Sequence, residues 1–485
     1  MFARLKLKPQ ANRHKLQIPY TGLIQHAHFR DHISGCESLA QMCGSGIGIW
    51  NFLFGVVMMA KDMLGRSGVV SREEALRTLE RHFILPALET DELFISQTLD
   101  RVLSEDIAAP ENLPAFNRST MDGFAVRSAD TFGASEGHAA YLAIVGDVLM
   151  GAIPDRTLFK GEAMKIPTGG ALPQGADAVV MLEYAQFIDE ASIEVVKPVA
   201  PFENVIQIGD DIRKGESILS RGHRLRPQDM SALASLGLTR IRVYAKPSVA
   251  IISTGNEIVP AESRPAPGQI RESNSYNLEG LITQSGCIPV KKGIIPDDIT
   301  LLRKAIEGAI SDSHLILVTG GSSVGTADFT AKVIDNFGPP GVLVHGVAVK
   351  PGKPLIIGLV KSNKKPALLP IFGLPGHPVA VNICFELFVK PILVRLTGET
   401  PHPALVGISP YRTVKARLAR SIASNPGRED HVRVTLERRD DGFWVKPVFG
   451  ASGLISTLVK AVGTVVVPVD KNGIETGEEV DVRLF

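Results

Sequence analysis

Short apolar runs alternate with helical patterns between residues 247 and 398, and this alternation constrains the fold more than any other feature. The runs predict strands at 248–253, 288–295, 314–318, 342–349 and 368–372. Helices are expected between and after them, at 274–286, 298–311, 327–337 and 378–390. Apolar strands that alternate with helices are typical of a parallel sheet covered on both faces. We therefore expect a doubly wound α/β domain.

Three residues set expected helix boundaries in this region. Asp297 is expected to cap the helix at 298–311, since aspartate accepts hydrogen bonds from first-turn amides. Pro378 fits the first turn of the last helix, and Pro391 is expected to end that helix.

The chain before this region has a different pattern. Ser71 and Glu74 have the spacing of a capping box in front of a helix. Residues 140–206 have short β-like runs broken by glycine and proline turns, which favours a small β-rich domain. A helix at 226–238 could return the chain to the segment that begins at Ser71.

The tail, residues 399–485, has an all-β pattern. Apolar and polar residues alternate around an Asp441-Gly442 turn and again around Asn472-Gly473, as in β-hairpins.

Composition excludes some functions. A chain of 485 residues is long enough for about three domains. Its formal net charge of +1 gives no global basic field for nucleic acid. Cys36, Cys43, Cys287 and Cys384 show neither metal-ligand spacing nor a disulfide framework, which favours a reducing cytoplasm.

The N-terminal segment differs from the rest. It begins with a basic stretch and contains an uncharged, mostly apolar run at 44–60. We expect residues 1–62 to be an upstream extension that is non-native or disordered, with Met58, Met59 or Met63 as the biological start. An interfacial or membrane anchor is the alternative.

Unusual polar loops follow four of the expected strands. They are "TGNEIV" after 248–253, "TGGSSVGTAD" after 314–318, "KPGKP" (350–354) after 342–349 and "GLPGHPVA" (373–380) after 368–372. Open α/β sheets bind ligands beyond the carboxyl ends of their strands. We therefore expect the four loops to form one crevice.

Each loop also has an ordinary structural interpretation. "KPGKP" could be a plain turn with solvated lysines, "GLPGHP" a strand-to-helix connection, and Asp328 a helix cap. Together on one edge, however, glycine-rich backbone, two lysines and free N–H groups at a helix start favour an oxyanion site. A carboxylate such as Asp328 beside an anion indicates a cation between them. Asp122 in "MDG" and Asp211 in "DDIRKG" could be simple turn residues.

Seven motifs, in this order and spacing, resemble the molybdopterin molybdenumtransferase family, to which bacterial MoeA and the C-terminal part of gephyrin belong. They are "NRSTMDGFAVRSAD", "IPTGGALPQGADAVVMLEY", "ISTGNEIV", "GQIRESNSY", "GGSSVGTADFT", "VAVKPGKP" and "GLPGHPVAV". The resemblance covers roughly residues 65–485.

The resemblance implies a multidomain α/β and β architecture of four parts. These are a helical and extended segment (63–110 and 207–246), a β-rich insert (111–206), a molybdopterin-binding α/β domain (247–398) and a C-terminal β-barrel (399–485). It also implies a homodimer, whose active site lies between the α/β domain of one subunit and the insert of the other.

The implied reaction is insertion of molybdate into adenylylated molybdopterin with Mg²⁺ and release of AMP, in the cytoplasm. Downstream molybdoenzymes or their chaperones would be further partners, whereas nucleic acid and membrane would not. The family's pattern assigns catalysis to Asp122, Asp211, Asp328, Lys350 and Lys353, and Mg²⁺ to Asp328 and Asn256. It assigns substrate binding to Thr168, Thr254, Gly255, Asn256, Glu257, Gly320, Gly321, Ser322, Ser323, Gly325, Pro375, Gly376, His377 and Pro378.

Two residues depart from this pattern. Asn256 stands where most relatives have aspartate, and His377 where asparagine is frequent. Asparagine still offers a carbonyl oxygen but brings no charge. A tungstate-preferring paralogue or a non-catalytic molybdopterin carrier therefore remains an alternative, and a molybdopterin adenylyltransferase is a third.

Overall fold

The structure is a computed structural model that describes residues 69–320, 324–362, 368–400 and 411–485. All of them belong to the unit Ala60–Phe485. The expected extension at 1–62 lies outside the described residues, as do Met58, Met59 and Met63. Within the described ranges, no helix is long and apolar enough to cross a membrane.

The α/β domain has a six-stranded sheet in the order β16-β13-β17-β21-β20-β18. Its strands are β13 (Ser248–Thr254), β16 (Ile288–Ile295), β17 (Leu315–Gly320), β18 (Gly341–His345), β20 (Ile356–Lys361) and β21 (Leu368–Leu374). The first four in spatial order are parallel, whereas β20 runs antiparallel to both of its neighbours. The sheet is therefore mixed rather than wholly parallel, and β20 was not expected.

The strand predicted at 342–349 is wrong in its second half. β18 ends at His345, and β19 (Val349–Lys350) pairs in parallel with a strand of the C-terminal domain. The chain thus leaves one sheet and joins another within a few residues. This brings the "KPGKP" loop against the C-terminal domain.

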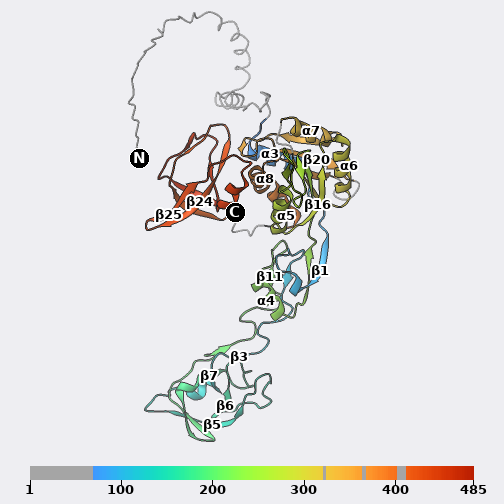
Figure 1. The fold of residues 1–485 in the computed structure, drawn as a ribbon. Coiled ribbons are helices and arrows are strands. Elements are labelled where there is room, and N and C mark those ends of the chain that lie inside the picture. The colour runs from blue at the N-terminus through green and yellow to red at the C-terminus, as the bar shows by residue number, and fades with distance from the viewer. Residues whose placement is uncertain (1–68, 321–323, 363–367, 401–410) are drawn as a thin grey trace, which may run out of the picture. The chain divides into compact units, whose positions relative to one another are not determined.

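Helices cover both faces of the sheet (Figure 1). α5 (Asn274–Gln284) and α8 (Pro378–Cys384) pack on one face, and α6 (Ile299–Ile310) and α7 (Val324–Asp335) on the other. α3 (Arg72–His82), capped by Ser71 as predicted, also packs on the first face through Ala75, Leu79 and Phe83. α3 therefore packs on the α/β domain. From its position in the sequence, it was expected to belong to the helical and extended segment (63–110 and 207–246).

Two of the predicted helix boundaries are wrong. Asp298, not Asp297, caps α6, because its carboxylate accepts from the backbone N–H of Leu301 at 2.9 Å. Pro391 does not end the last helical segment. A π-helical turn (Phe385–Val389) precedes it, and Pro391 lies in the first turn of α9 (Lys390–Leu396), where a missing N–H needs no partner.

Short strand pairs join the two stretches that flank the insert, and also the two ends of the insert itself. β1 (Thr90–Phe94) pairs with β12 (Arg240–Tyr244), β2 (Ile107–Ala108) with β11 (Ser217–Leu219), and β3 (Arg118–Ser119) with β10 (Val205–Ile206). α4 (Pro227–Ser235) packs here through the buried Leu233. Leu103, Ile107, Ile241 and Val243 complete a core drawn from both stretches.

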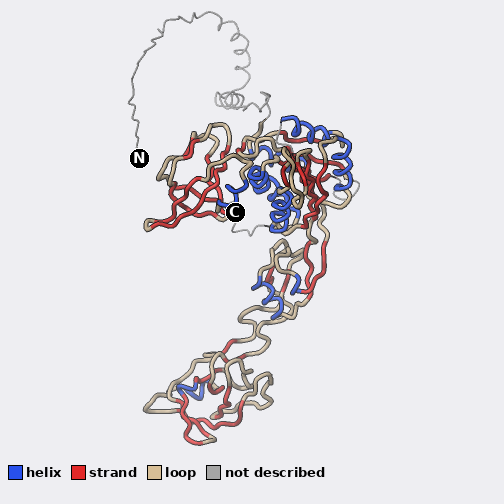
Figure 2. Tube along the Cα trace, in the orientation of Figure 1, coloured by secondary structure: helices blue, strands red, loops and turns tan. Residues whose placement is uncertain are grey.

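The insert is a six-stranded sheet in the order β7-β4-β6-β5-β9-β8. Its strands are red in Figure 2. Its strands are β4 (Gly123–Val126), β5 (Ala140–Asp147), β6 (Glu162–Ile166), β7 (Ala178–Met181), β8 (Ala185–Asp189) and β9 (Ser192–Val195). Apolar side chains are buried on both faces, with Phe124 and Val180 in one cluster and Met164 and Val179 in the other.

The C-terminal domain is a closed five-stranded barrel. Its strands are β22 (Thr413–Leu418), β24 (Glu429–Arg439), β25 (Gly442–Pro447), β26 (Gly463–Val467) and β28 (Glu479–Leu484), and pairing of β24 with β26 closes the ring. The Asp441-Gly442 hairpin is confirmed. The strands on either side of Asn472-Gly473, β26 and β28, pair antiparallel as expected. Their connection is longer than a tight turn, because β27 (Gly473–Ile474) pairs with β23 (Ile422–Ala423) before the chain enters β28. α10 (Ile455–Lys460) lies between β25 and β26.

Candidate functional site

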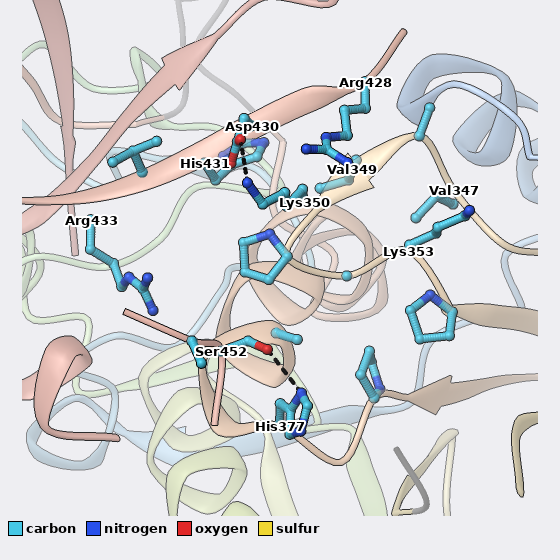
Figure 3. A pocket seen from close by; sticks show the side chains of 18 of the residues that line it. Val347, Val349, Lys350, Lys353, His377, Arg428, Asp430, His431, Arg433 and Ser452 are labelled. Atoms are coloured by element: carbon cyan, nitrogen blue, oxygen red, sulfur yellow. Dashed lines mark hydrogen bonds and ion pairs between the residues drawn. The ribbon is translucent and has the colours of Figure 1, made fainter. Parts of the chain in front are cut away.

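A cavity of about 530 Å³ lies between the α/β domain and the barrel (Figure 3). The α/β domain contributes the "KPGKP" loop and the residues that lead into α8, and the barrel contributes β24 and the segment 448–452. The polar residues that line it are Lys350, Lys353, His377, Arg428, Asp430, His431, Arg433 and Ser452.

The described lining of this cavity is strongly basic. It carries two lysines and two arginines, and Asp430 is its one carboxylate. The Nε atoms of Arg428 and Arg433 are buried without a hydrogen-bond partner in the part of the chain that the structure describes. A buried N–H left unpaired costs free energy, so a ligand that accepts from these groups is favoured.

Arg433 is held in place by its own hydrogen bonds. Nη1 donates to Thr457 Oγ1 at 3.0 Å and Nη2 to the carbonyl oxygen of Gly450 at 2.8 Å. Burial lowers the pKa of Arg433, but a guanidinium remains charged in proteins. A fixed, buried and charged side chain can bind an anion with little loss of conformational entropy.

Lys350 faces Asp430, the one carboxylate of the described lining. Its Nζ lies 2.9 Å from Asp430 Oδ2, which also accepts from Ser424 Oγ at 3.2 Å. Asp430 is 4 % exposed, whereas the Lys350 side chain is half-exposed. The ion pair therefore compensates the buried carboxylate and fixes Lys350 at the wall.

His377 and Ser452 meet across the two domains. His377 Nδ1 lies 2.8 Å from Ser452 Oγ, and the backbone N–H of Val379 donates to the Ser452 carbonyl oxygen at 3.2 Å. This N–H was expected to be open to an anion, so that expectation is wrong for Val379. Instead it anchors the barrel segment to the start of α8.

At the wall of the cavity, β24 carries part of a charged cluster in which His431 is buried and Glu429 and Arg72 are partly buried. His431 Nε2 lies 3.3 Å from Glu429 Oε2, and Arg72 Nε lies 3.7 Å from the same oxygen. Burial lowers the pKa of His431, although the neighbouring carboxylate opposes this. Burial disfavours the charged Glu429, but the hydrogen bond from His431 and the charge of Arg72 outweigh it and lower its pKa.

A second group of predicted residues lies at the end of β13. Thr254 Oγ1 donates to Asp297 Oδ1 at 2.8 Å, and the backbone N–H of Asp297 donates to Asn256 Oδ1 at 3.1 Å. Asn256 therefore already uses its carbonyl oxygen to hold the loop that leads into α6. Gly255 has a φ of 153°, a backbone conformation that residues with a side chain rarely adopt.

The glycine-serine loop after β17 is described only in part. A Cβ on Gly320 would lie 1.9 Å from the carbonyl oxygen of Thr254, which explains the glycine. Gly321, Ser322 and Ser323 lie outside the described residues. Gly325 and Asp328 fall within α7, whose side chains are described only after Asp328. Because α7 begins at Val324, the interpretation of Asp328 as a helix cap is wrong.

A hydrogen-bond network around Asn274 was not predicted from the sequence. Its Nδ2 donates to Thr319 Oγ1 at 3.1 Å and to the Gly376 carbonyl oxygen at 2.8 Å. Glu272, also buried, accepts from Ser253 Oγ at 3.2 Å. These residues connect the ends of β13 and β17 with the loop before α8. The motif "RESNSY" is part of the family resemblance, but no role was predicted for its residues.

Two predicted residues of the insert lie together. Asp122 Oδ1 accepts from the backbone N–H of Thr168 at 2.7 Å, and both residues are exposed. Asp211 is exposed on the segment that follows the insert. The cavity lining includes no described residue of the insert, so the structure of one chain does not bring these three residues to the lysines.

Four polar residues of the cavity were not predicted from the sequence: Arg428, Asp430, Arg433 and Ser452. They belong to the tail, which had been interpreted only as strands. The signals that could have found them are the charged run "GREDHVR" and the glycine-rich "GASG" at a strand end.

The fold and the cavity define a class of protein with an α/β domain, a β-rich insert and a closed barrel around a basic pocket. Three family descriptions match the chain: the MoeA N-terminal region (domain I and II) at residues 70–237, a probable molybdopterin binding domain at 250–395, and the MoeA C-terminal region (domain IV) at 415–485.

Individual proteins agree with these matches. A protein of Methanocaldococcus jannaschii named for molybdopterin biosynthesis is 37% identical over 81% of this chain and 92% of its own length. The molybdopterin molybdenumtransferase of Bacillus subtilis is 32% identical over 87% and 96%. The crystal structure of the MoeA protein from Pyrococcus horikosii superposes with a TM-score of 0.73 at 36% identity, over 86% of this chain and 99% of that one. The chain belongs to the MoeA family of molybdenum cofactor biosynthesis proteins.

Proposed function

We propose that this chain is a molybdopterin molybdenumtransferase, which inserts molybdate into adenylylated molybdopterin and releases AMP. The observation that carries the proposal is the basic cavity between the "KPGKP" loop and the barrel. Molybdate is a tetrahedral dianion, and charge-assisted hydrogen bonds from lysine and arginine are the strongest that a protein offers to such a group.

In this proposal Arg433, Lys353 and Ser452 bind the oxyanion. Arg433 is charged and fixed, and Ser452 Oγ is a hydroxyl held at the wall. Fixed donors stabilise negative charge without reorganising during the reaction. The volume of about 530 Å³ is within the range of small-molecule sites, about 300–1,000 Å³, and so has room for part of the organic substrate as well.

We propose that Mg²⁺ serves the nucleotide end of the substrate, at the carboxyl edge of β13 and β17. Asp297 and Asn256 place oxygen atoms there, and Asp328 follows in α7. No group of three or more His, Cys, Asp or Glu side chains suited to a metal occurs in the described ranges. Mg²⁺ binds one or two carboxylates together with substrate phosphates and water. The ion would neutralise the charge of the pyrophosphate.

We propose a homodimer that completes the site. Asp122 and Thr168 form one exposed turn pair, and Asp211 lies on a neighbouring exposed segment. Since the insert is absent from the described lining of the cavity, a second copy would have to supply these residues. A reducing cytoplasm suits Cys287 and Cys384, which are free buried thiols.

Release of AMP from adenylylated molybdopterin tests the proposal. AMP should appear in the presence of molybdate and Mg²⁺, together with molybdenum bound to the pterin. Tight binding of the substrate without AMP release would instead indicate a carrier. Equal or faster release with tungstate would identify a tungstate-preferring enzyme, and formation of the adenylylated compound from ATP would identify an adenylyltransferase.

A further inference from the structure

We propose that His377 is a positioning residue that decides whether Ser452 can donate a hydrogen bond to an oxyanion in the cavity. The inference rests on the proposed function, because it assumes that an oxyanion binds there. It starts from one contact, the 2.8 Å distance between His377 Nδ1 and Ser452 Oγ (Figure 3).

A serine hydroxyl has one proton, which can be used in only one direction. If Nδ1 carries no proton, it accepts the Ser452 proton, and Ser452 then turns only lone pairs toward the cavity. If Nδ1 carries a proton, it donates to Oγ, and the Ser452 proton is available to a ligand. An oxyanion only accepts hydrogen bonds, so it requires the second arrangement.

Protonation of the imidazole enforces this arrangement. A histidinium donates from both ring nitrogens, so Ser452 can then only accept from His377. The added charge also attracts an anion. Oxyanion affinity should therefore rise as the pH falls and weaken as the pH rises.

The position of Ser452 does not depend on His377 alone. The Val379 N–H bond to the Ser452 carbonyl oxygen at 3.2 Å holds the same segment through backbone atoms. A substitution at 377 should therefore change the direction of the serine proton while the serine stays in place. This separates the proposed role from a purely structural one.

Other titratable or charged groups line the same cavity or lie on elements that contact α8, and they could also respond to pH. The cavity is lined by Lys350 and Lys353 of the "KPGKP" loop and by Arg428, Asp430, His431 and Arg433 of β24 and the residue before it. Glu272 precedes α5 and Lys460 ends α10, and both helices contact α8. All of them remain in a variant that changes only His377, so the comparison isolates the one imidazole.

The test is calorimetric titration of the full-length protein with molybdate at several pH values between about 6 and about 8. For the unaltered protein we expect affinity to fall about three- to tenfold across this range. His377→Asn keeps a polar group near Nδ1 but does not titrate, and its affinity should change with pH clearly less than that of the unaltered protein. Ser452→Ala should bind weakly at every pH and keep only the smaller pH dependence that comes from the charge of His377. His138→Asn, at an exposed histidine of the insert, should behave like the unaltered protein.

Two results would overturn the inference, and they are distinguishable. Parallel pH profiles for the unaltered protein and His377→Asn would show that another group titrates, and would remove His377 from this role while leaving the oxyanion site intact. Absence of molybdate binding by the unaltered protein at every pH would contradict the proposed oxyanion site itself, and the inference with it.

Discussion

At the scale of single residues, Arg433 is a cation of the cavity that two hydrogen bonds hold in place. Replacement by methionine removes its charge while keeping an apolar chain against the barrel. We expect the affinity for molybdate to fall at least tenfold, which is about 1.4 kcal/mol, because a charge-assisted hydrogen bond is lost. Calorimetric titration at neutral pH measures this directly.

The matched control is Arg439→Met, since Arg439 lies on the same strand but is exposed and pairs with Glu437. It should bind molybdate as the unaltered protein does. Equal loss in both variants would show that Arg433 acts only through the general charge of the barrel.

The Lys350–Asp430 pair gives a second prediction. Lys350→Met leaves Asp430 buried with only Ser424 as a described hydrogen-bond partner, which should lower the free energy of unfolding of the barrel by about 1–3 kcal/mol. The loss should be near the low end, because the lysine is half-exposed. Urea unfolding followed by Trp444 fluorescence, in a Trp50→Phe background, reports on this domain.

Adding Asp430→Asn removes the uncompensated charge and should restore part of the stability. If the double variant is as unstable as the sum of both single variants, the two side chains do not act as a pair.

The polar residues on the α/β side of this cavity were predicted from the sequence. Lys350, Lys353 and His377 stand out because prolines and glycines surround them at the ends of expected strands. Arg433 and Ser452 could not be found in the same way. They reach the cavity only because β19 joins the barrel, and a pairing between distant segments leaves no local pattern.

At the scale of elements, the N-terminus of α4 depends on Asp229. Its carboxylate accepts from Arg226 Nη2 at 2.9 Å and from the Arg226 backbone N–H at 2.8 Å, and it lies 2.7 Å from His223 Nε2. Burial opposes the ionised form, but the hydrogen bonds from Arg226 and His223 outweigh burial and lower the pKa of Asp229 to about 2.

This lowered pKa predicts a pH-dependent contribution of about 2 kcal/mol. The folded value lies below the ordinary value of 3.8, so the contribution is complete above that pH and is lost as the pH falls toward about 2. Asp229→Asn should therefore speed hydrogen exchange of α4 amides at neutral pH. The difference from the unaltered protein should shrink near pH 3. A difference that persists unchanged at acid pH would exclude ionisation as its source.

Local chemistry predicted the elements well where it acts alone. The Ser71 cap and the Asp441-Gly442 hairpin are confirmed because capping and turn preferences depend on neighbouring residues. The prediction that Pro391 ends the last helix is wrong, because a π-helical turn places Pro391 in the first turn of α9. The sequence shows no pattern that predicts this turn. The antiparallel direction of β20 is likewise a property of the whole sheet.

At the scale of the whole molecule, the proposed dimer predicts complementation. Asp122→Ala and Lys353→Ala subunits should each be nearly inactive in AMP release. Mixed in equal amounts after subunit exchange, they should recover about one quarter of the activity, because half of the dimers are mixed and each has one intact site. Size-exclusion chromatography with light scattering should show two copies. No recovery, despite demonstrated exchange, would place both residues in one subunit's site.

In the proposed function, the basic cavity between the "KPGKP" loop and the barrel binds molybdate. Anomalous diffraction at the molybdenum edge, from crystals soaked in molybdate, tests it most directly. We expect one strong peak within hydrogen-bond reach of Arg433 and Ser452, absent from crystals of Arg433→Met. A peak elsewhere on the chain, with this cavity empty, would contradict it.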